Sequence, residues 1–259
     1  MAIHCLLRRG LLASAAILVA APARGVQPVG LRVLCAGAMY ASTHDVIRGF
    51  TADTGRTVDL VVANPGALGR RLRDGERADL VLNSARQLAA MAAAGLVDGT
   101  SIVELGRMRI GLGVRAGAPR PEIATPEQLK QALLAAPGVA YADPTGTPLG
   151  VHVLRMMDAM GIGTDMAPRS MLTHHGMAAA EAVAAGRSTL VLAQASEILA
   201  VPGVALVGLL PDSVNLVTAY AGAIATRCTD RPSAQALLHR LLGPEGQARL
   251  RQSGFLPAA

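Results

Sequence analysis

Residues 141–154 read YADPTGTPLGVHVL, a stretch that places turn residues and hydroxyl side chains directly before a helical pattern. Asp143-Pro144 favours a tight turn, and Thr145 and Thr147 supply hydroxyls at the start of the helix. The first N–H groups of a helix have no partner inside it, and with the helix dipole they attract anions. The stretch is either a plain surface connection or a loop that presents N–H groups to an anionic ligand.

Other polar side chains follow short apolar runs elsewhere in the chain. Asn64 and Gln194 carry amides, which both donate and accept hydrogen bonds. His174 and His175 precede another helix start, where an imidazole can contact a carboxylate. Adjacent histidines rarely share one ion, and no Cys or carboxylate stands at ligand spacing, so we expect no metal or other cofactor.

Sequence motifs of common enzyme classes are missing. The chain has no G-x-S-x-G elbow, P-loop, H-E-x-x-H or C-x-x-C. Ser42 and His44 are two residues apart on a predicted helix and therefore face different directions. Glu197 is interpreted as a helix cap or an interface residue rather than a catalytic base. The sequence predicts a binding protein and no enzyme.

The elements that must position these residues alternate between strands and helices. An apolar run at 31–36 is followed by helical periodicity at 39–55, and this order repeats. Such alternation predicts an α/β fold with mostly parallel sheets flanked by helices. Two longer extended runs, 107–115 and 216–226, separate two βαβ modules. We therefore expect two lobes joined by two crossover strands, one from 24–107 with 222–259 and the other from 108–221.

In an open α/β sheet, ligands lie beyond the carboxyl ends of the strands. This rule selects the loops at 37–40, 63–67, 142–150, 174–177 and the strand end at 193–197.

The first 23 residues differ from the rest. Arg8-Arg9 precede an apolar run of about 11 residues, too short to span a bilayer, and Ala21-Pro22-Ala23 is typical of a cleavage site. We expect a secretory signal peptide, cleaved after Ala23, and a periplasmic mature protein. The arginine pair leaves both general and twin-arginine export open.

Bulk composition narrows the partners. Of 259 residues, 51% are apolar and 16% charged, which suits a large buried core. The formal charge is +6, but the basic residues form no cluster interleaved with aromatic residues, so we expect no nucleic acid partner. Only 2% of residues are aromatic, which disfavours stacking on sugars. Cys35 and Cys228 are interpreted as unpaired thiols, and the protein as a monomer.

Several stretches, in this order, resemble the periplasmic molybdate-binding-like family of ABC transporter substrate-binding proteins, which have the type II periplasmic binding protein fold. They are VLCAGAM, PGALGRRLRDGERADLVLNSA, YADPTGTPLGVHVL, AEAVAAGRSTLVLAQASEI and LLGPEGQARLRQSGF. The resemblance spans about residues 31 to 256. It implies a two-lobed fold that closes like a hinge on one small anion and delivers it to an ABC permease in the inner membrane.

The resemblance also marks where this chain departs from the molybdate receptors. Their three expected hydroxyl donors fall here on Ala38, Pro65 and Gln194. A small organic acid is therefore favoured over strict molybdate, with a molybdate or tungstate receptor as the alternative. A periplasmic hydrolase, or a ligand sensor without transport, is the alternative from another class.

The resulting site prediction combines backbone N–H groups with three side chains. The backbone donors are expected near Ala38, Met39, Gly66, Ala67, Leu149, Gly150, Gly176 and Met177. The side chains are those of Asn64, Thr147 and Gln194.

Overall fold

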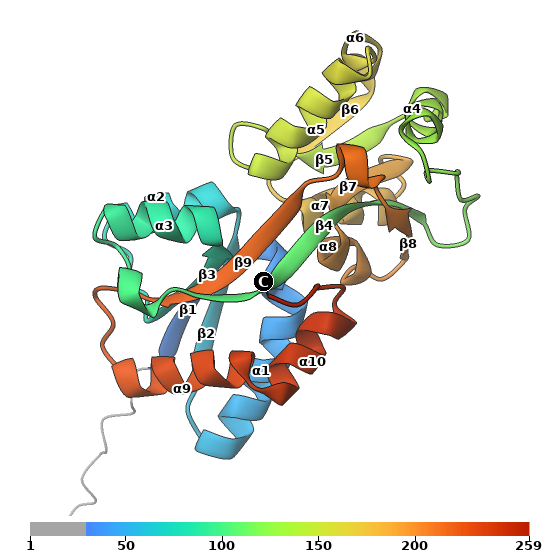
Figure 1. Ribbon diagram of the computed structural model, residues 1–259. Helices are drawn as coiled ribbons and strands as arrows, with labels where there is room; N and C mark the ends of the chain where they lie inside the picture. The colour runs from blue at the N-terminus through green and yellow to red at the C-terminus, as the bar shows by residue number, and fades with distance from the viewer. Residues whose placement is uncertain (1–29, 259) are drawn as a thin grey trace, which may run out of the picture.

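One curved mixed sheet of nine strands runs through two α/β lobes (Figure 1). This computed structural model describes residues 30–258, so the predicted signal peptide at 1–23 lies outside the described residues. The strand order is β2-β1-β3-β9-β4-β7-β5-β6, and β8 pairs with β4. The predicted two-lobed α/β architecture is confirmed, whereas the exact lobe boundaries stay a prediction.

Lobe 1 has a parallel β2-β1-β3 core, with α2 and α3 on one face and α1, α9 and α10 on the other (Figure 1). Its elements are β1 (Leu31–Ala36), α1 (Tyr40–Thr54), β2 (Val58–Ala63), α2 (Pro65–Arg73), β3 (Leu80–Ser84), α3 (Ala85–Ala93), α9 (Arg231–Leu242) and α10 (Pro244–Gln252), with short 3₁₀ turns η1 (Gly37–Met39) and η2 (Gly99–Ser101).

Lobe 2 repeats the arrangement with a parallel β7-β5-β6 core. Its elements are α4 (Pro126–Ala135), β5 (Val139–Ala142), α5 (Pro148–Ala159), α6 (Gly163–Met166), β6 (Ser170–Thr173), α7 (Gly176–Ala184), β7 (Leu190–Gln194), α8 (Ala195–Leu199) and β8 (Val204–Leu209), with short turns η3 (Ala167–Arg169) and η4 (Asp212–Val214). The sequence pattern did not predict β6 or α8, because four or five residues carry too little periodicity.

Two long strands connect the lobes. The first half of β4 (Val103–Arg115) pairs with β9 (Val217–Ile224), and its second half pairs with β7 and β8. All of these pairs are antiparallel, as is the pair of β3 with β9. The two crossover strands expected from the runs at 107–115 and 216–226 are confirmed.

Each lobe buries its own apolar core. In lobe 1 the core gathers side chains such as Leu34, Leu82 and Leu237 around the sheet. In lobe 2 one cluster lies under α4, α5 and α6, and another under α7 and α8. Separate cores allow the lobes to move about the crossover strands without unfolding either one.

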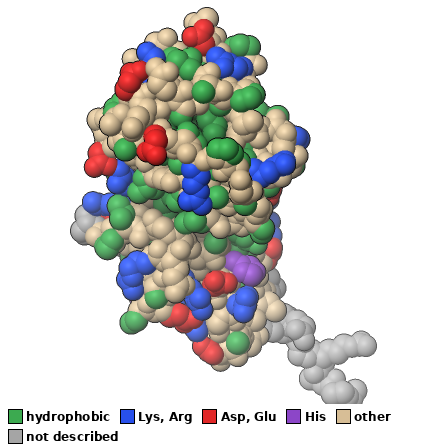
Figure 2. All heavy atoms as spheres, turned by 90° about the vertical axis from the view of Figure 1, so that its right-hand side faces the viewer, with side chains coloured by type: hydrophobic (Ala, Val, Ile, Leu, Met, Phe, Trp, Pro, Cys, Tyr) green, Lys and Arg blue, Asp and Glu red, His purple; other side chains and the backbone are tan. Residues whose placement is uncertain are grey.

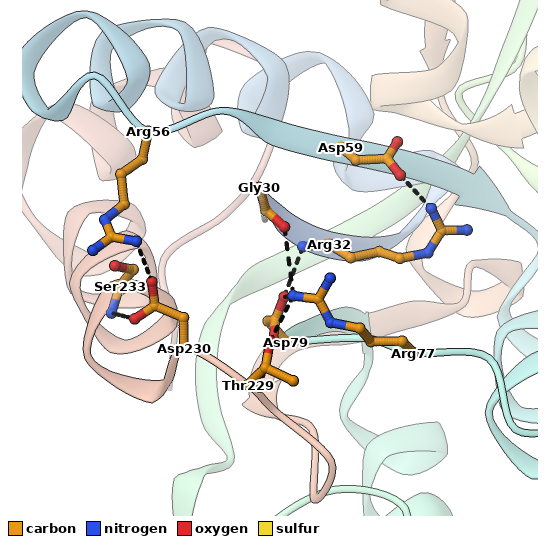
Figure 3. A network of polar contacts seen from close by, with 9 residues as sticks. All are labelled: Gly30, Arg32, Arg56, Asp59, Arg77, Asp79, Thr229, Asp230 and Ser233. Atoms are coloured by element: carbon orange, nitrogen blue, oxygen red, sulfur yellow. Dashed lines mark hydrogen bonds and ion pairs between the residues drawn. The ribbon is translucent and has the colours of Figure 1, made fainter. Parts of the chain in front are cut away.

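The end of lobe 1 remote from the other lobe contains a buried charge, Asp79 (Figure 3). It accepts hydrogen bonds from the N–H groups of Arg32 (2.9 Å) and Thr229 (2.8 Å), and from the Arg77 guanidinium (2.7 Å). Burial opposes ionisation, but these donors and the Arg77 charge together lower the pKa of Asp79. The carboxylate thereby ties β1 and β3 to the segment that enters α9.

Replacing Asp79 by Ala is expected to lower the free energy of unfolding by about 3 kcal/mol, because the buried donors lose their acceptor. Asp59→Ala is the matched control, since Asp59 also pairs with Arg32 but its side chain is 58% exposed. That variant is expected to lose less than about 1 kcal/mol. Equal losses in urea unfolding followed by circular dichroism would contradict this assignment.

The surface charge is mixed (Figure 2), and the two described cysteines are unpaired. Figure 2 shows basic and acidic side chains interspersed over both lobes on one face of the molecule. Within residues 30–258, every helix is too short or too polar to cross a bilayer. Cys35 and Cys228 are free thiols, as expected.

Candidate functional site

A small cavity of about 40 Å³ lies between the lobes, at the carboxyl ends of the parallel strands. Segments that follow β1, β2, β3, β5, β6 and β7 line it, together with part of β9. The lining residues are Ala36, Gly37, Ala38, Asn64, Pro65, Ser84, Ala142, Thr147, Pro148, Leu149, His175, Gly176, Gln194, Glu197, Thr218 and Tyr220. We call it the inner cavity. All five loop regions selected from the sequence meet here.

Six of the eleven predicted site residues line the inner cavity. They are Ala38, Asn64, Thr147, Leu149, Gly176 and Gln194. Gly66 lines a second, outer cavity instead. The four that line neither cavity are Met39, Ala67, Gly150 and Met177.

Capping side chains already occupy two of the predicted backbone donors, those of Ala67 and Gly150. The Ala67 N–H donates to Asn64 Oδ1 (2.7 Å), and the Gly150 N–H donates to Thr147 Oγ1 (3.0 Å). At α7 the Ala178 N–H donates to His175 Nδ1 (3.1 Å). Each cap takes the N–H at the third helical position, as Asn, Thr and other short polar side chains commonly do.

Most polar groups of the turn at 143–147 form hydrogen bonds with other groups of the same turn. Asp143 Oδ1 accepts from the N–H and the hydroxyl of Thr145, both at 2.7 Å, and this pairing lowers the pKa of Asp143. The Asp143 carbonyl accepts from the N–H groups of Gly146 and Thr147 (3.2 Å each). The turn is therefore rigid, and it directs the first turn of α5 toward the cavity.

The caps leave one N–H group without an acceptor in the first turn of each of two helices. Pro65 and Pro148 occupy the first positions of α2 and α5 and have no N–H. The second positions, Gly66 and Leu149, receive no acceptor from their own helices. These two N–H groups, one from each lobe, are the backbone donors best placed for a ligand.

Gln194 carries an unsatisfied polar atom beside the cavity. The side chain is 3% exposed, and its Nε2 donates to Thr218 Oγ1 (3.3 Å). Its Oε1 faces the first turn of α8 as a capping side chain does, but it is buried and has no hydrogen-bond partner among residues 30–258. Buried acceptors are rarely left unpaired, so this oxygen is free to accept a hydrogen bond from a group in the cavity.

Glu197 is the most unusual group in the inner cavity. Its side chain is 6% exposed, and its Oε2 accepts from the Gln194 N–H at 3.3 Å. The backbone N–H groups of Gly176 and Met177 also donate to this carboxylate, so two predicted ligand donors are already engaged. Burial raises the pKa of Glu197 to about 7, against the effect of these donors.

Two glycines make room for that carboxylate, one from each lobe. A Cβ at Gly176 would lie 2.0 Å from Oε2, and a Cβ at Gly37 would lie 2.8 Å from Oε1. Any larger residue at Gly176 would displace the Glu197 side chain. Glu197 therefore lies where the loop after β1 meets the start of α7.

The lobes also touch directly at the mouth of the inner cavity. Asn64 Nδ2 in lobe 1 donates to the His174 carbonyl in lobe 2 at 3.3 Å. A Cβ at Gly66 would lie 3.2 Å from the Gly146 carbonyl of the opposite lobe. Asn64 thus both caps α2 and bridges the cleft, which describes a closed arrangement of the lobes.

The outer cavity, of about 510 Å³, adjoins the inner one through Thr147 and Pro148. Arg70 on α2 and Arg86 on α3 line it from lobe 1, and Arg155 on α5 lines it from lobe 2. None of these arginines forms an ion pair within the described part of the chain. No acidic residue lines this cavity, so its field favours anions.

Among residues 30–258, no three His, Cys, Asp or Glu side chains lie close enough together to hold a metal ion.

This geometry agrees with comparisons to known proteins. Residues 31–256 match the family described as bacterial extracellular solute-binding protein. The chain belongs to this family. An aconitate isomerase from Pseudomonas sp. is 33% identical over 258 residues, which covers 94% of each chain.

Solved structures of solute-binding proteins share the fold at lower identity. The periplasmic molybdate-binding protein of Azotobacter vinelandii is 14% identical with a TM-score of 0.76, covering 88% of this chain and 100% of that one. The sulfate-binding protein of Mycobacterium tuberculosis is 19% identical with a TM-score of 0.69, covering 88% and 87%. The resemblance to molybdate-binding-like receptors predicted from the sequence is confirmed at the level of the fold.

Four polar residues that line the inner cavity were not among the predicted ligand contacts. They are Ser84, Thr218, Tyr220 and Glu197, of which Glu197 was interpreted from the sequence as a cap or interface residue. Ser84 caps α3 by accepting a hydrogen bond from the Gln87 N–H at 3.4 Å. The sequence offered one signal for Glu197, a carboxylate three residues after the amide of Gln194 at the end of a strand. The burial of Glu197 could not be predicted, because it depends on how lobe 1 packs against lobe 2.

The raised pKa of Glu197 predicts a pH-dependent stability. The folded protein holds this proton up to pH about 7, whereas the unfolded chain releases it near 4.5. Stability from this group is therefore complete below pH 4.5 and is lost as the pH rises through 7. Between pH 5 and 8 the wild type is expected to lose about 2 kcal/mol relative to Glu197→Gln. Urea unfolding at several pH values measures this difference, and parallel curves for the two proteins would contradict it.

Proposed function

We propose that this protein is the periplasmic receptor of an ABC-type importer and closes on a small organic acid with several carboxylates. One observation supports this class of ligand. An inner cavity with an unpaired hydrogen-bond acceptor adjoins an outer cavity lined by arginines. A sensor that reports its ligand to a membrane partner would use the same cleft.

The inner cavity supports an acid rather than an oxyanion. The N–H group of Leu149 suits a carboxylate oxygen in the inner cavity, as that of Gly66 does in the adjoining outer cavity, whereas the unpaired Oε1 of Gln194 needs a donor. A hydroxyl or a protonated carboxyl group donates, but a fully ionised molybdate or sulfate only accepts. By the same measure the inner cavity is far smaller than the outer one, about 40 Å³ against about 510 Å³, so we assign one such group to the inner cavity and the rest of a polycarboxylate to the outer one.

The outer cavity supports additional carboxylates on the same ligand. Arg70, Arg86 and Arg155 surround a space that opens directly from the inner cavity. Guanidinium groups bind carboxylates through paired N–H donors. Because these arginines come from both lobes, an anion between them would offset their mutual repulsion and favour closure.

A binding screen tests this proposal on mature protein that has been unfolded, stripped of ligand and refolded. It compares trans-aconitate, cis-aconitate, citrate, succinate and tricarballylate with molybdate, tungstate and sulfate. A ligand present at 100 times its Kd adds about 2.7 kcal/mol to the free energy of unfolding, a clear thermal shift. We expect a tricarboxylate to give the largest shift. Stabilisation by molybdate or tungstate alone would replace the proposal with the oxyanion alternative.

Replacing Arg155 by Gln is expected to weaken binding of the best tricarboxylate about tenfold, because one charge-assisted contact across the cleft is lost. Arg120→Gln, in a loop that lines neither cavity, is the control and should leave Kd unchanged. Isothermal titration calorimetry measures both. Equal affinities of the Arg155 variant and the wild type would exclude the outer cavity from the ligand site.

A second candidate function is isomerisation of an unsaturated tricarboxylate. Two observations favour it: the 33% identical aconitate isomerase, and Glu197 with a pKa of about 7 in the cavity. A general base is most effective when its pKa lies near the working pH. Glu197 would remove a proton from the methylene carbon of trans-aconitate, the double bond would shift by one position, and a proton would return to the former vinyl carbon. The reaction is balanced and needs no redox partner.

Proton NMR of trans-aconitate with the purified protein in D₂O tests this activity. Formation of cis-aconitate, with deuterium entering the new methylene group, would support it. Glu197→Gln is expected to reduce the rate at least 100-fold, while Glu181→Gln on the surface of α7 should not change it. Tight binding without turnover would leave the receptor function alone.

A further inference from the structure

We propose that Glu197 is a ligand-binding residue that acts in its protonated form, so that each anion entering the inner cavity is accompanied by one proton. The inference rests on the proposed function, because it requires an anion in that cavity. It concerns how the receptor holds its ligand, whereas the isomerase candidate needs Glu197 as a free carboxylate base and therefore the opposite protonation state.

The position of Glu197 on the wall of the inner cavity places it to contact a ligand there. The side chain lines a cavity of about 40 Å³, and Gly37 and Gly176 enclose it from the two lobes. Any group that fills such a volume lies within a few ångströms of the carboxylate. The cleft is also closed beside it, by the Asn64 side chain on the His174 carbonyl.

The carboxylate has no cation to offset a second negative charge. Its donors are the backbone N–H groups of Gln194, Gly176 and Met177. Within residues 30–258, Glu197 takes part in no ion pair. Two like charges in one desolvated site raise the proton affinity of one of them, as in paired catalytic carboxylates. An anionic ligand would therefore retain a proton on Glu197, and that proton can be donated to the ligand.

The other titratable groups that line the inner cavity stay neutral between pH 7 and 9. Tyr220 on β9 also lines it, and burial raises the pKa of this phenol well above its ordinary value. His175 at the start of α7 is neutral in this range, because burial lowers its pKa below 6.5. Cys35 on β1 lies near Tyr220, and burial raises the pKa of its thiol to about 12. η1 contributes only Gly37, Ala38 and Met39, and the facing end of β7 contributes the neutral Gln194.

Calorimetric titration from pH 7 to 9 tests the coupling, with the tightest ligand of the panel above as the probe. In the wild type, Kd should weaken toward tenfold for each pH unit above 7. Titrations in two buffers of different ionisation enthalpy should show uptake approaching one proton per ligand. Glu181→Gln, on the same helix as His175 but exposed, should behave like the wild type.

For Glu197→Gln, the Kd for the probe should not vary with pH between 7 and 9, and binding should take up no proton. Binding by the wild type that is independent of pH would overturn the inference while leaving the proposed function intact. A slope that persists in Glu197→Gln would assign the proton to the ligand and overturn it as well. Absence of binding by every ligand at every pH would instead remove the proposed function, and the inference with it.

A second measurement applies if Glu197→Gln fails to fold. Carbon-13 NMR of wild-type protein labelled in its glutamate carboxyl groups follows the titration of Glu197 directly. Its midpoint should rise by at least one pH unit when the probe saturates the protein. An unchanged or lowered midpoint would overturn the inference.

Discussion

A carboxylate withdrawn from water needs hydrogen-bond donors, and at Glu197 the backbone of lobe 2 supplies them. The N–H groups of Gly176 and Met177 at the start of α7, and that of Gln194 before α8, converge on this one side chain. The carboxylate thus fixes the relative positions of two loops that line the inner cavity. Because Gly37 of lobe 1 packs against it, the same group also defines how closely the lobes approach.

The separate cores and the two crossover strands fit this arrangement. Each lobe is stable around its own apolar cluster, so the cleft does not have to supply the folding energy. Polar and charged groups can therefore remain at the cleft without apolar packing around them, as the unpaired oxygen of Gln194 and the unpaired outer arginines show. Structural compromises of this kind are expected at functional sites.

Much of the fold follows from the sequence because alternation of strands and helices is a local, periodic signal. The long runs at 107–115 and 216–226 correctly identified β4 and β9. The short elements β6 and α8 escaped prediction, since they depend on tertiary pairing more than on pattern.

The site was predictable as a set of loops but not as a set of contacts. The carboxyl ends of parallel strands necessarily converge, so the five loops selected from the sequence all reach the inner cavity. Which N–H groups remain available depends on competition from capping side chains, and Asn64, Thr147 and Glu197 take donors that the sequence suggested for the ligand. That competition is decided by side-chain geometry, which the order of residues does not reveal.

Both lobes place the same short motif at the cleft, an N-cap residue followed by proline. It is Asn64-Pro65 in lobe 1 and Thr147-Pro148 in lobe 2. Proline fixes its own φ angle, and the cap holds the third N–H, so the donor between them has little remaining freedom. Conformational entropy at these positions is therefore lost when the chain folds and not when the ligand arrives. Such a cleft recognises its ligand by fit rather than by adaptation. Molecules that differ by the placement of one carboxylate should consequently be told apart sharply.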